Sequence, residues 1–250
     1  MIIIKSEGTI MENKRIPRYI HYCWFGGKTI PLQYEKYMKS WKEFCPDFEI
    51  MRWDESNFPI EDFMYAAEAY KENKMAFVSD VARIYALQKF GGIYLDTDVE
   101  IIKPLDTILR GHEAVLGWES IKANTMGTGF LAFVPKHIIC ERMIDYYKEH
   151  HFKLEDGTLN IKSNTRILAE LIEKEYGLLP STSVQSKSGI IIYPRRYFTA
   201  FSTVTKQSEI TDDTYCIHHF AASWFSPWKK VKREVKMKIN RILKIAGKQI

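Results

Sequence analysis

Apolar residues along this chain follow two spacings, one typical of strands and one typical of helices. Short runs that are apolar, or that alternate with polar residues, predict strands, and apolar residues three or four positions apart predict helices. The predicted strands lie within 16–27, 48–53, 93–95, 99–102, 114–118, 130–134, 189–193 and 215–224, and the predicted helices within 31–44, 63–74, 76–90, 137–151 and 164–175. Strands that alternate with helices in this way predict an α/β fold.

The stretch richest in candidate chemistry follows a double glycine. An apolar strand, 93–95, ends in two carboxylates one residue apart, Asp96 and Asp98. In extended backbone these two side chains point to the same side. The carboxyl ends of strands are also where open α/β sheets collect their ligands. Two oxygen donors aimed at one point suit Mg²⁺ or Mn²⁺, especially when phosphate oxygens complete the coordination shell.

Asp80 and Arg83 stand three residues apart in the helix just upstream, so both can meet the same ligand. The planar fork of an arginine suits sugar hydroxyls as well as a diphosphate. A plain intrahelical salt bridge between the two residues is the alternative explanation.

The two carboxylates admit other interpretations. An Asp-x-Asp tripeptide is also found in solvated turns. A calcium loop is excluded because Ile101 stands where such a loop needs a glycine for its sharp turn. A haloacid-dehalogenase-like phosphatase also places Asp-x-Asp after an apolar strand, with Asp96 as its nucleophile, but this leaves Asp80 and Arg83 unexplained. A non-catalytic module that binds sugar or membrane is a third alternative.

Two further motifs flank this stretch. Residues 16–27 form an apolar segment that contains Trp24 and ends in two glycines, which let a backbone come close to a nucleotide. Residues 215–224 contain His218 and His219, and imidazole is a suitable ligand for ions of the Mn²⁺ type. Adjacent strand residues face opposite ways, so we expect only one histidine, His218 before His219, to reach a metal. Trp24 could instead simply cover the end of the sheet.

These motifs together resemble the DXD-type sugar transferases of glycosyltransferase family 32. The resemblance rests on Ser79-Asp-Val-Ala-Arg83, on Gly91-Gly-Ile-Tyr-Leu-Asp-Thr-Asp98 and on the two flanking motifs, and it spans roughly residues 16–225. The family includes bacterial capsule and lipopolysaccharide enzymes and yeast mannosyltransferases, and the clostridial glucosylating toxins are distantly similar. It implies a GT-A fold, a Rossmann-like mixed sheet flanked by helices. It also implies a nucleotide-sugar donor and retention of the anomeric configuration.

The resemblance also implies roles for individual residues. Asp98 and His218 would bind the metal, and Asp96 would contact the ribose, or the metal through water. The implied donor-binding residues are Trp24 on the nucleobase, Asp80 and Arg83 on the sugar or diphosphate, and Ser223 and Trp224 beside the diphosphate. Residues 125–130, expected to form a glycine-bearing loop, and 164–166 are weaker candidates for the acceptor side.

Composition divides the chain into a mildly acidic body and a basic tail. The 250 residues carry a net charge of +5, but nine basic residues and one acidic residue fall in 229–250, which alone carries +8. Its apolar residues recur at helical spacing, so we expect a GT-A domain over 1–228 and a basic amphipathic helix over 229–250 that binds an anionic membrane surface. A solvated helix docked on the body is the alternative. The tail lacks aromatic residues to stack on bases, so no nucleic-acid partner is expected.

The four cysteines are scattered without a metal-binding spacing, which predicts reduced core residues. No signal peptide or spanning segment is expected, so the chain is expected to be cytoplasmic and peripheral on the inner face of the membrane. The sequence thus predicts a metal-dependent retaining glycosyltransferase that uses Mn²⁺ or Mg²⁺. A UDP-sugar is favoured over GDP-mannose as donor, and the acceptor would be a saccharide or lipid-linked glycan of surface polysaccharide synthesis.

Overall fold

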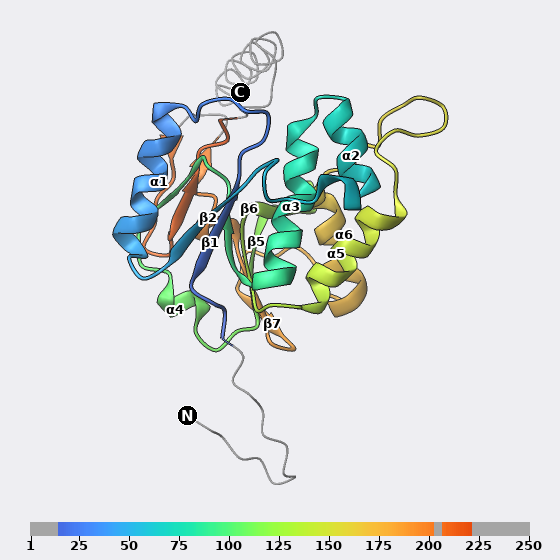
Figure 1. The fold of residues 1–250 in the computed structure, drawn as a ribbon. Helices are drawn as coiled ribbons and strands as arrows, with labels where there is room; N and C mark the ends of the chain where they lie inside the picture. The colour runs from blue at the N-terminus through green and yellow to red at the C-terminus, as the bar shows by residue number, and fades with distance from the viewer. Residues whose placement is uncertain (1–14, 203–206, 222–250) are drawn as a thin grey trace, which may run out of the picture.

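The computed structural model describes residues 15–202 and 207–221, and a seven-stranded mixed sheet forms its centre (Figure 1). The strand order is β2-β1-β3-β6-β5-β8-β7. The strands of this sheet are β1 (Tyr19–Cys23), β2 (Glu49–Trp53), β3 (Gly92–Leu95), β5 (Ala114–Ser120), β6 (Thr125–Phe133), β7 (Gln185–Lys187) and β8 (Ile190–Tyr193). The α/β prediction is therefore confirmed, with strands that are both parallel and antiparallel.

The parallel pairs set the edge of the sheet that carries the candidate chemistry. β1 pairs with β2 and with β3 in parallel, and Ile20 lies opposite Ile93. The carboxyl ends of β1 and β3 consequently lie at the same edge, where Trp24 and Asp96 leave the sheet. β6 runs antiparallel between β3 and β5 and brings its first residues to that edge.

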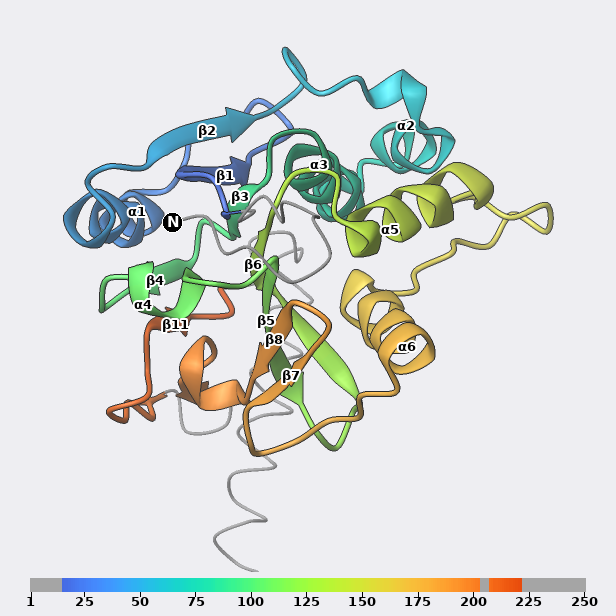
Figure 2. The same cartoon turned by 90° about the horizontal axis from the view of Figure 1, so that it is seen from below.

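Helices cover both faces of the sheet (Figure 2). On one face lie α2 (Met64–Lys71), α3 (Met75–Phe90), α5 (Ile138–Glu149) and α6 (Asn164–Tyr176), and on the other lie α1 (Leu32–Phe44) and α4 (Asp106–Leu109). Each face of the sheet has its own hydrophobic core, and successive side chains of β3 point into different cores. Tyr94 packs with the α3 side, while Ile93 and Leu95 pack with the α1 side. Short 3₁₀ turns cover Ile60–Asp62 and Arg195–Tyr197.

The double glycine between α3 and β3 is required by close packing. Both residues have positive φ, +64° at Gly91 and +97° at Gly92. A Cβ atom on Gly91 would lie 2.6 Å from the nitrogen of Pro135, and one on Gly92 would lie 2.7 Å from the carbonyl oxygen of Tyr19. Glycine therefore lets the chain leave α3 and enter β3 tightly against β1.

A second, two-stranded sheet lies beside the end of β3. β4 (Val99–Ile101) pairs antiparallel with β11 (Cys216–His218), so that His218 lies opposite Val99. This pairing carries the 215–221 segment to the two carboxylates, from which it is more than a hundred residues distant in sequence. A further small sheet joins β9 (Phe201–Ser202) to β10 (Gln207–Ser208).

The structure corrects one element. Residues 125–129, expected to be a loop, belong to the long strand β6. Glycines usually weaken a strand, but here they allow bulky rings to lie directly on the sheet, as described below. All four cysteines are buried and unpaired, as predicted. Among the described residues no helix has the length and apolar character needed to cross a bilayer. The predicted helix at 229–250 lies outside the described residues.

Candidate active site

Asp96, Asp98 and His218 converge at the end of β3. One potential ligand atom from each of the three residues lies within 4.8 Å of the others. His218 Nε2 is 3.3 Å from Asp98 Oδ1 and 3.8 Å from Asp96 Oδ2. Two carboxylates and one imidazole form a donor set that fits Mn²⁺ or Mg²⁺ with open positions for phosphate oxygens.

The charges of this cluster favour a cation at its centre. Burial alone would lower the pKa of His218, but Asp98, Asp96 and Glu119 outweigh burial and raise it to about 9. Burial likewise opposes ionisation of Asp98, yet the charge and hydrogen bond of His218 bring the Asp98 pKa down to about 2. The carboxylates of Asp96 and Asp98 are therefore stabilised by a nearby positive charge. The His218 imidazolium provides that charge here, and a divalent ion would provide it in its place.

The segment after β11 holds Asp98 from two sides. The backbone N–H of Ala221 donates to Asp98 Oδ2 at 2.7 Å, and that of His219 donates to the Asp98 carbonyl at 3.0 Å. The His219 side chain turns away, with Nε2 2.9 Å from Glu100 Oε2 and its ring stacked on Tyr37 at 4.0 Å. The two histidines therefore diverge as the strand alternation predicts, and His218 is the one that faces both aspartates.

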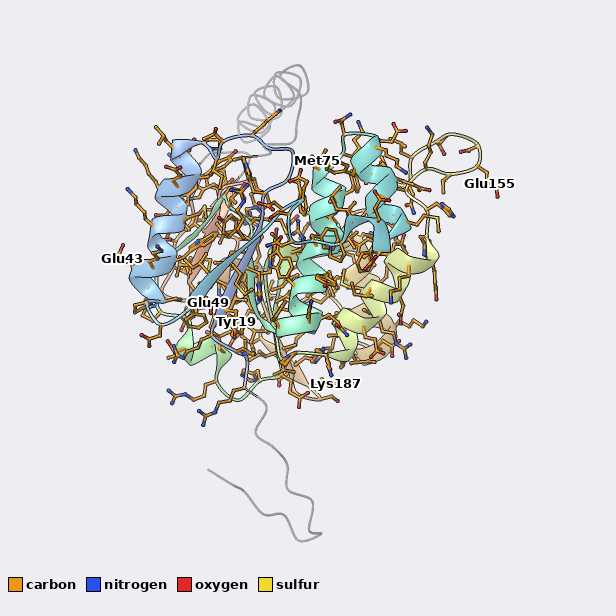
Figure 3. The ribbon with its side chains drawn as sticks, in the orientation of Figure 1. Tyr19, Glu43, Glu49, Met75, Glu155 and Lys187 are labelled. Atoms are coloured by element: carbon orange, nitrogen blue, oxygen red, sulfur yellow. The ribbon has the colours of Figure 1, made fainter. Side chains whose placement is uncertain are left out.

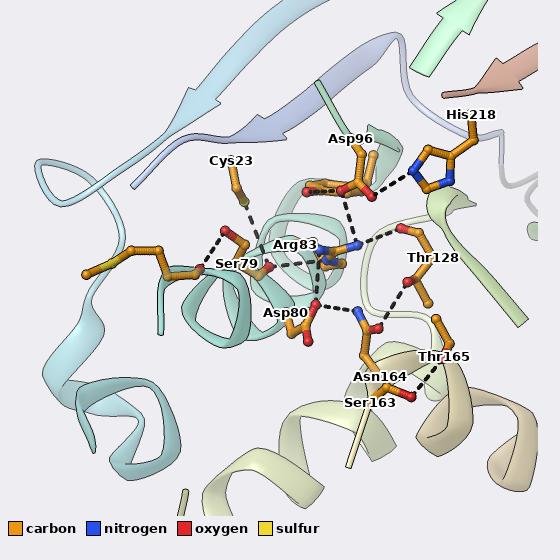
Figure 4. A network of polar contacts seen from close by, with 12 residues as sticks. Cys23, Ser79, Asp80, Arg83, Asp96, Thr128, Ser163, Asn164, Thr165 and His218 are labelled. Atoms are coloured by element: carbon orange, nitrogen blue, oxygen red, sulfur yellow. Dashed lines mark hydrogen bonds and ion pairs between the residues drawn. The ribbon is translucent and has the colours of Figure 1, made fainter. Parts of the chain in front are cut away.

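Arg83 connects the carboxylates to helix α3 (Figure 4). Its guanidinium is 3.0 Å from Asp80 Oδ1 and 3.3 Å from Asp96 Oδ1, and it donates to the Thr128 carbonyl at 2.8 Å. Arg83 is 6% exposed. The predicted pair of Asp80 and Arg83 is thus both an i,i+3 salt bridge and part of the site, because the same guanidinium also reaches Asp96.

Three residues that sequence reasoning missed or left open complete this network. The Tyr94 hydroxyl donates to Asp96 Oδ1 at 2.9 Å, and its ring lies 4.6 Å from the Arg83 guanidinium carbon. Asn164, a weaker candidate for the acceptor side, donates to Asp80 Oδ1 at 2.7 Å and accepts from Thr128 Oγ1 at 3.0 Å. The alternation along β3 could have placed Tyr94 on the α3 face. Thr128 and Asn164 fall within the weaker candidate ranges 125–130 and 164–166, but no local signal indicates their contacts with Arg83 and Asp80.

Burial leaves Asp80 less acidic than an ordinary aspartate. Desolvation raises its pKa to about 6, Asp96 adds to the rise, and Arg83 opposes it. Among the described residues, this carboxyl group contacts Arg83 and Asn164, in both cases through Oδ1. Neither of these contacts uses the second oxygen, Oδ2.

Two further candidates, Trp24 and Arg166, contact residues outside this network. Trp24 follows β1, donates its indole N–H to the Lys28 carbonyl and meets the Tyr34 ring edge-on at 6.0 Å. Its contact with a nucleobase remains a prediction. Arg166 pairs with Glu170 and donates to the Ala123 carbonyl, away from Asp80. Ser223 and Trp224 lie outside the described residues.

Comparison with known proteins agrees with this geometry. Residues 31–115 match the family described as a glycosyltransferase sugar-binding region containing DXD motif, and this range includes Asp80, Arg83 and both carboxylates. Inositol phosphoceramide mannosyltransferase 1 of Schizosaccharomyces pombe is 29% identical over 135 residues, which are 50% of this chain and 41% of that protein. Lactosylceramide 4-alpha-galactosyltransferase of Homo sapiens is 35% identical over 94 residues, 36% of this chain and 25% of that protein. The chain thus spans well under half the length of these relatives.

The fold is similar to a solved structure described as PaToxG glycosyltransferase. The TM-score is 0.54 at 18% identity, over 66% of this chain and 71% of that one. This likeness concerns the fold alone. The chain therefore has a GT-A-type fold, and its residues 31–115 are similar to the sugar-binding region of glycosyltransferases that contain a DXD motif.

Proposed function

We propose that this protein is a metal-dependent retaining glycosyltransferase. It would move a sugar from a nucleotide-diphosphate sugar, with a UDP-sugar favoured over GDP-mannose, to a saccharide or lipid-linked glycan. The observation that carries the proposal is the joining of the Asp96, Asp98 and His218 cluster to Asp80 through the buried Arg83. One continuous network would then bind the diphosphate at the metal and the donor sugar at Asp80. Retention, the nucleotide and a role in surface polysaccharide synthesis follow from the family resemblance.

In this reaction the bond between the anomeric carbon and a diphosphate oxygen breaks. A bond from the same carbon to an acceptor oxygen forms, and the proton of the acceptor hydroxyl passes to the released diphosphate. A bound Mn²⁺ or Mg²⁺ would neutralise the leaving diphosphate. Asp98 and His218 would hold the ion, and Asp98 is already fixed by the Ala221 N–H.

The buried position of Arg83 supports a positioning role in addition to ligand binding. Its guanidinium is committed to Asp80, Asp96 and the Thr128 carbonyl. Arg83 thereby orients the carboxylates of Asp80 and Asp96. Asp80 Oδ2 would then remain for the donor sugar, and Asp96 Oδ2 for the metal. The positive charge of the Arg83 guanidinium would also attract a diphosphate that approaches the metal.

The same contacts weigh against the phosphatase alternative. A phosphatase nucleophile needs an unencumbered carboxylate oxygen, whereas Asp96 Oδ1 accepts from Tyr94 and pairs with Arg83, and Asp96 Oδ2 faces His218. A non-catalytic module would not need this arrangement of charges around a site for a cation.

Association with an anionic membrane surface is part of the proposal. It rests on the +8 charge and helical spacing of residues 229–250. The named acceptors of the two relatives above are glycolipids or related lipids, which supports an acceptor located at a membrane. A cytoplasmic position on the inner face is the corresponding proposal for location.

Turnover across a panel of UDP- and GDP-sugars with Mn²⁺ tests the function. Manganese-dependent nucleotide release from one donor is expected, and Asp98→Asn should abolish it. Asp62→Asn, on an exposed 3₁₀ turn, is the matched control and should leave the rate unchanged. Phosphate release from simple monoesters, with no release from any nucleotide sugar, would instead favour the phosphatase.

A further inference from the structure

The turn that follows β11 contains an aromatic residue in a backbone conformation that such residues rarely adopt. Phe220 has a φ of +50°, which lies in the left-handed region. A residue other than glycine is strained there, and a bulky side chain makes the conformation more unusual. The other described residues that have a positive φ and are not glycines carry polar side chains, and they are Asn73, Asn124, Lys136 and Ser188. Strain of this kind persists only where neighbouring contacts impose it.

The residue before Phe220 is anchored to β4 and to α1. His219 Nε2 lies 2.9 Å from Glu100 Oε2 in β4, and the His219 ring stacks on Tyr37 of α1 at 4.0 Å with an interplanar angle of 10°. Tyr37 is held in turn, because its hydroxyl accepts from Gln33 Nε2 at 2.8 Å. The start of the turn is therefore fixed on two elements at once.

The residues on both sides of Phe220 bond to the same aspartate. The Ala221 N–H donates to Asp98 Oδ2 at 2.7 Å, and the His219 N–H donates to the Asp98 carbonyl oxygen at 3.0 Å. Backbone N–H groups converge in this way around a left-handed residue, as they do in anion-binding nests. The strained conformation of Phe220 thus turns the Ala221 N–H back onto the carboxylate of a candidate metal ligand.

The side chain of Phe220 contacts a second candidate ligand, His218. The two rings stack with their centroids 4.1 Å apart and their planes 23° apart. The imidazole also lies directly on β6, because a Cβ atom on Gly129 would be 2.8 Å from it. Only 12% of the His218 side chain is exposed, so its ring has little freedom to rotate. Its Nε2 is thereby directed at Asp98 and Asp96.

We propose that Phe220 is a positioning residue of the metal site. Its ring fixes the plane of the His218 imidazole, and its left-handed backbone aims the Ala221 N–H at Asp98. One residue thus orients two ligands of a divalent cation of the Mn²⁺ or Mg²⁺ type before the ion binds. The anchored His219 keeps the strained turn from relaxing. The inference rests on the metal-dependent function proposed above.

Two substitutions separate the effect of the ring from that of the backbone. Phe220→Ala and Phe220→Gly both remove the ring, but only glycine adopts a positive φ without strain. The Mn²⁺ affinity of each protein is measured by calorimetric titration with the metal alone. The Mn²⁺ concentration that half-saturates nucleotide release provides a second value. Unfolding in urea without metal measures the stability of each variant.

Metal affinity and stability should change independently in these variants. Both substitutions should weaken Mn²⁺ binding about tenfold or more, because the loss of residues that orient metal ligands has effects of this size. Phe220→Gly should have a higher urea midpoint than Phe220→Ala, since it relieves the strain, and yet bind Mn²⁺ no better. Phe220→Tyr keeps the ring and should bind Mn²⁺ within about twofold of wild type.

Phe90→Ala is the matched control for the loss of a packed ring. Phe90, the last residue of α3, is also partly buried and also lies near a histidine, His21, at 6.1 Å between ring centroids. It packs against Tyr19, which lies at the opposite end of the molecule from Met75, where α3 begins (Figure 3). This variant should have a lower urea midpoint and a Mn²⁺ affinity within about twofold of wild type.

Two results would overturn the positioning role. One is a wild-type Mn²⁺ affinity in both Phe220→Ala and Phe220→Gly, which would show that His218 and Asp98 keep their orientation without the ring. The other is a loss of Mn²⁺ affinity that follows the urea midpoint in every variant, Phe90→Ala included. A wild-type protein that neither binds Mn²⁺ nor releases nucleotide in its presence would instead refute the proposed function, so the two failures are distinguishable.

Discussion

The Tyr94 hydroxyl donates to Asp96 Oδ1 at 2.9 Å, while its ring lies under the Arg83 guanidinium. Tyr94 is 1% exposed, so this contact is made in the interior, next to the candidate metal cluster. One side chain of β3 thereby fixes both an arginine and a carboxylate of the site. The arrangement leaves Asp96 Oδ2 directed at His218.

Tyr94→Phe should keep the ring under Arg83 and remove only the hydrogen bond. A hydrogen bond to a charged group contributes about 1.5–3 kcal/mol, so we expect a loss of roughly tenfold or more in kcat/KM for nucleotide release. Tyr85→Phe in α3, which loses only a 3.1 Å contact with Lys89, is the control and should retain wild-type kinetics. Wild-type kinetics in Tyr94→Phe would show that Arg83 alone orients Asp96.

Gly129→Ala should disturb the metal site without a change of charge. The added Cβ would lie 2.8 Å from His218 and 3.1 Å from Asp96 Oδ2, so the imidazole must move. Changes that reorient metal ligands weaken metal affinity roughly 10–100-fold, and we expect a loss of that size for Mn²⁺.

Calorimetric titration with Mn²⁺ measures this affinity. Gly127→Ala, two residues earlier on β6, is the control because its nearest contact would be 3.5 Å. Equal Mn²⁺ affinity in the two variants would show that His218 does not bind the ion.

The site residues that could be predicted are those fixed by local geometry. Asp96 and Asp98 do converge, but on a turn between β3 and β4 and not in the extended backbone that the sequence predicts. Asp80 and Arg83 share a helical face, and the alternation separates His218 from His219. These relationships span only a few residues, so periodicity reveals them. The resemblance to a known family then indicates that the three segments form one site.

Other contacts depend on tertiary structure and leave no local trace. Asn164 and Asp80 are 84 residues apart, and their hydrogen bond exists only because α6, which packs on β6, brings its first residue close to α3. The error at 125–129 has the same origin. Glycines there suggested a loop, but Gly129 serves the packing of His218, a residue almost ninety positions later.

The buried His21 should make the protein less stable in acid. His21 is fully buried, donates to the Gly91 carbonyl through Nε2 and accepts from the Trp53 indole at Nδ1. Burial lowers its pKa to about 4, although the Gly91 bond opposes this. Between pH 6.5 and 4 the unfolded chain binds a proton that the folded chain excludes, so stability falls as pH falls.

Above pH 6.5 neither state holds this proton, and below pH 4 both do, so the loss is confined to that window. At about 1.4 kcal/mol per pH unit, the decrease amounts to roughly 3 kcal/mol. Urea unfolding across this range should show a smaller decrease for His21→Gln than for wild type. Parallel profiles for the two proteins would assign the proton uptake to other groups.

Two buried tyrosines whose rings are in contact differ in the hydrogen bonding of their hydroxyl groups. Tyr65 and Tyr147 are each 1% exposed, and their rings lie 5.1 Å apart. The Tyr65 hydroxyl donates to the Asn160 carbonyl at 3.0 Å, whereas the Tyr147 hydroxyl has no hydrogen-bond partner among the described residues. Tyr65→Phe should therefore cost about 1 kcal/mol of unfolding free energy, and Tyr147→Phe should cost nothing or stabilise the protein. Urea titrations of the two variants measure both values. An equal cost in both would mean that the Tyr147 hydroxyl bonds to an ordered water molecule inside the core.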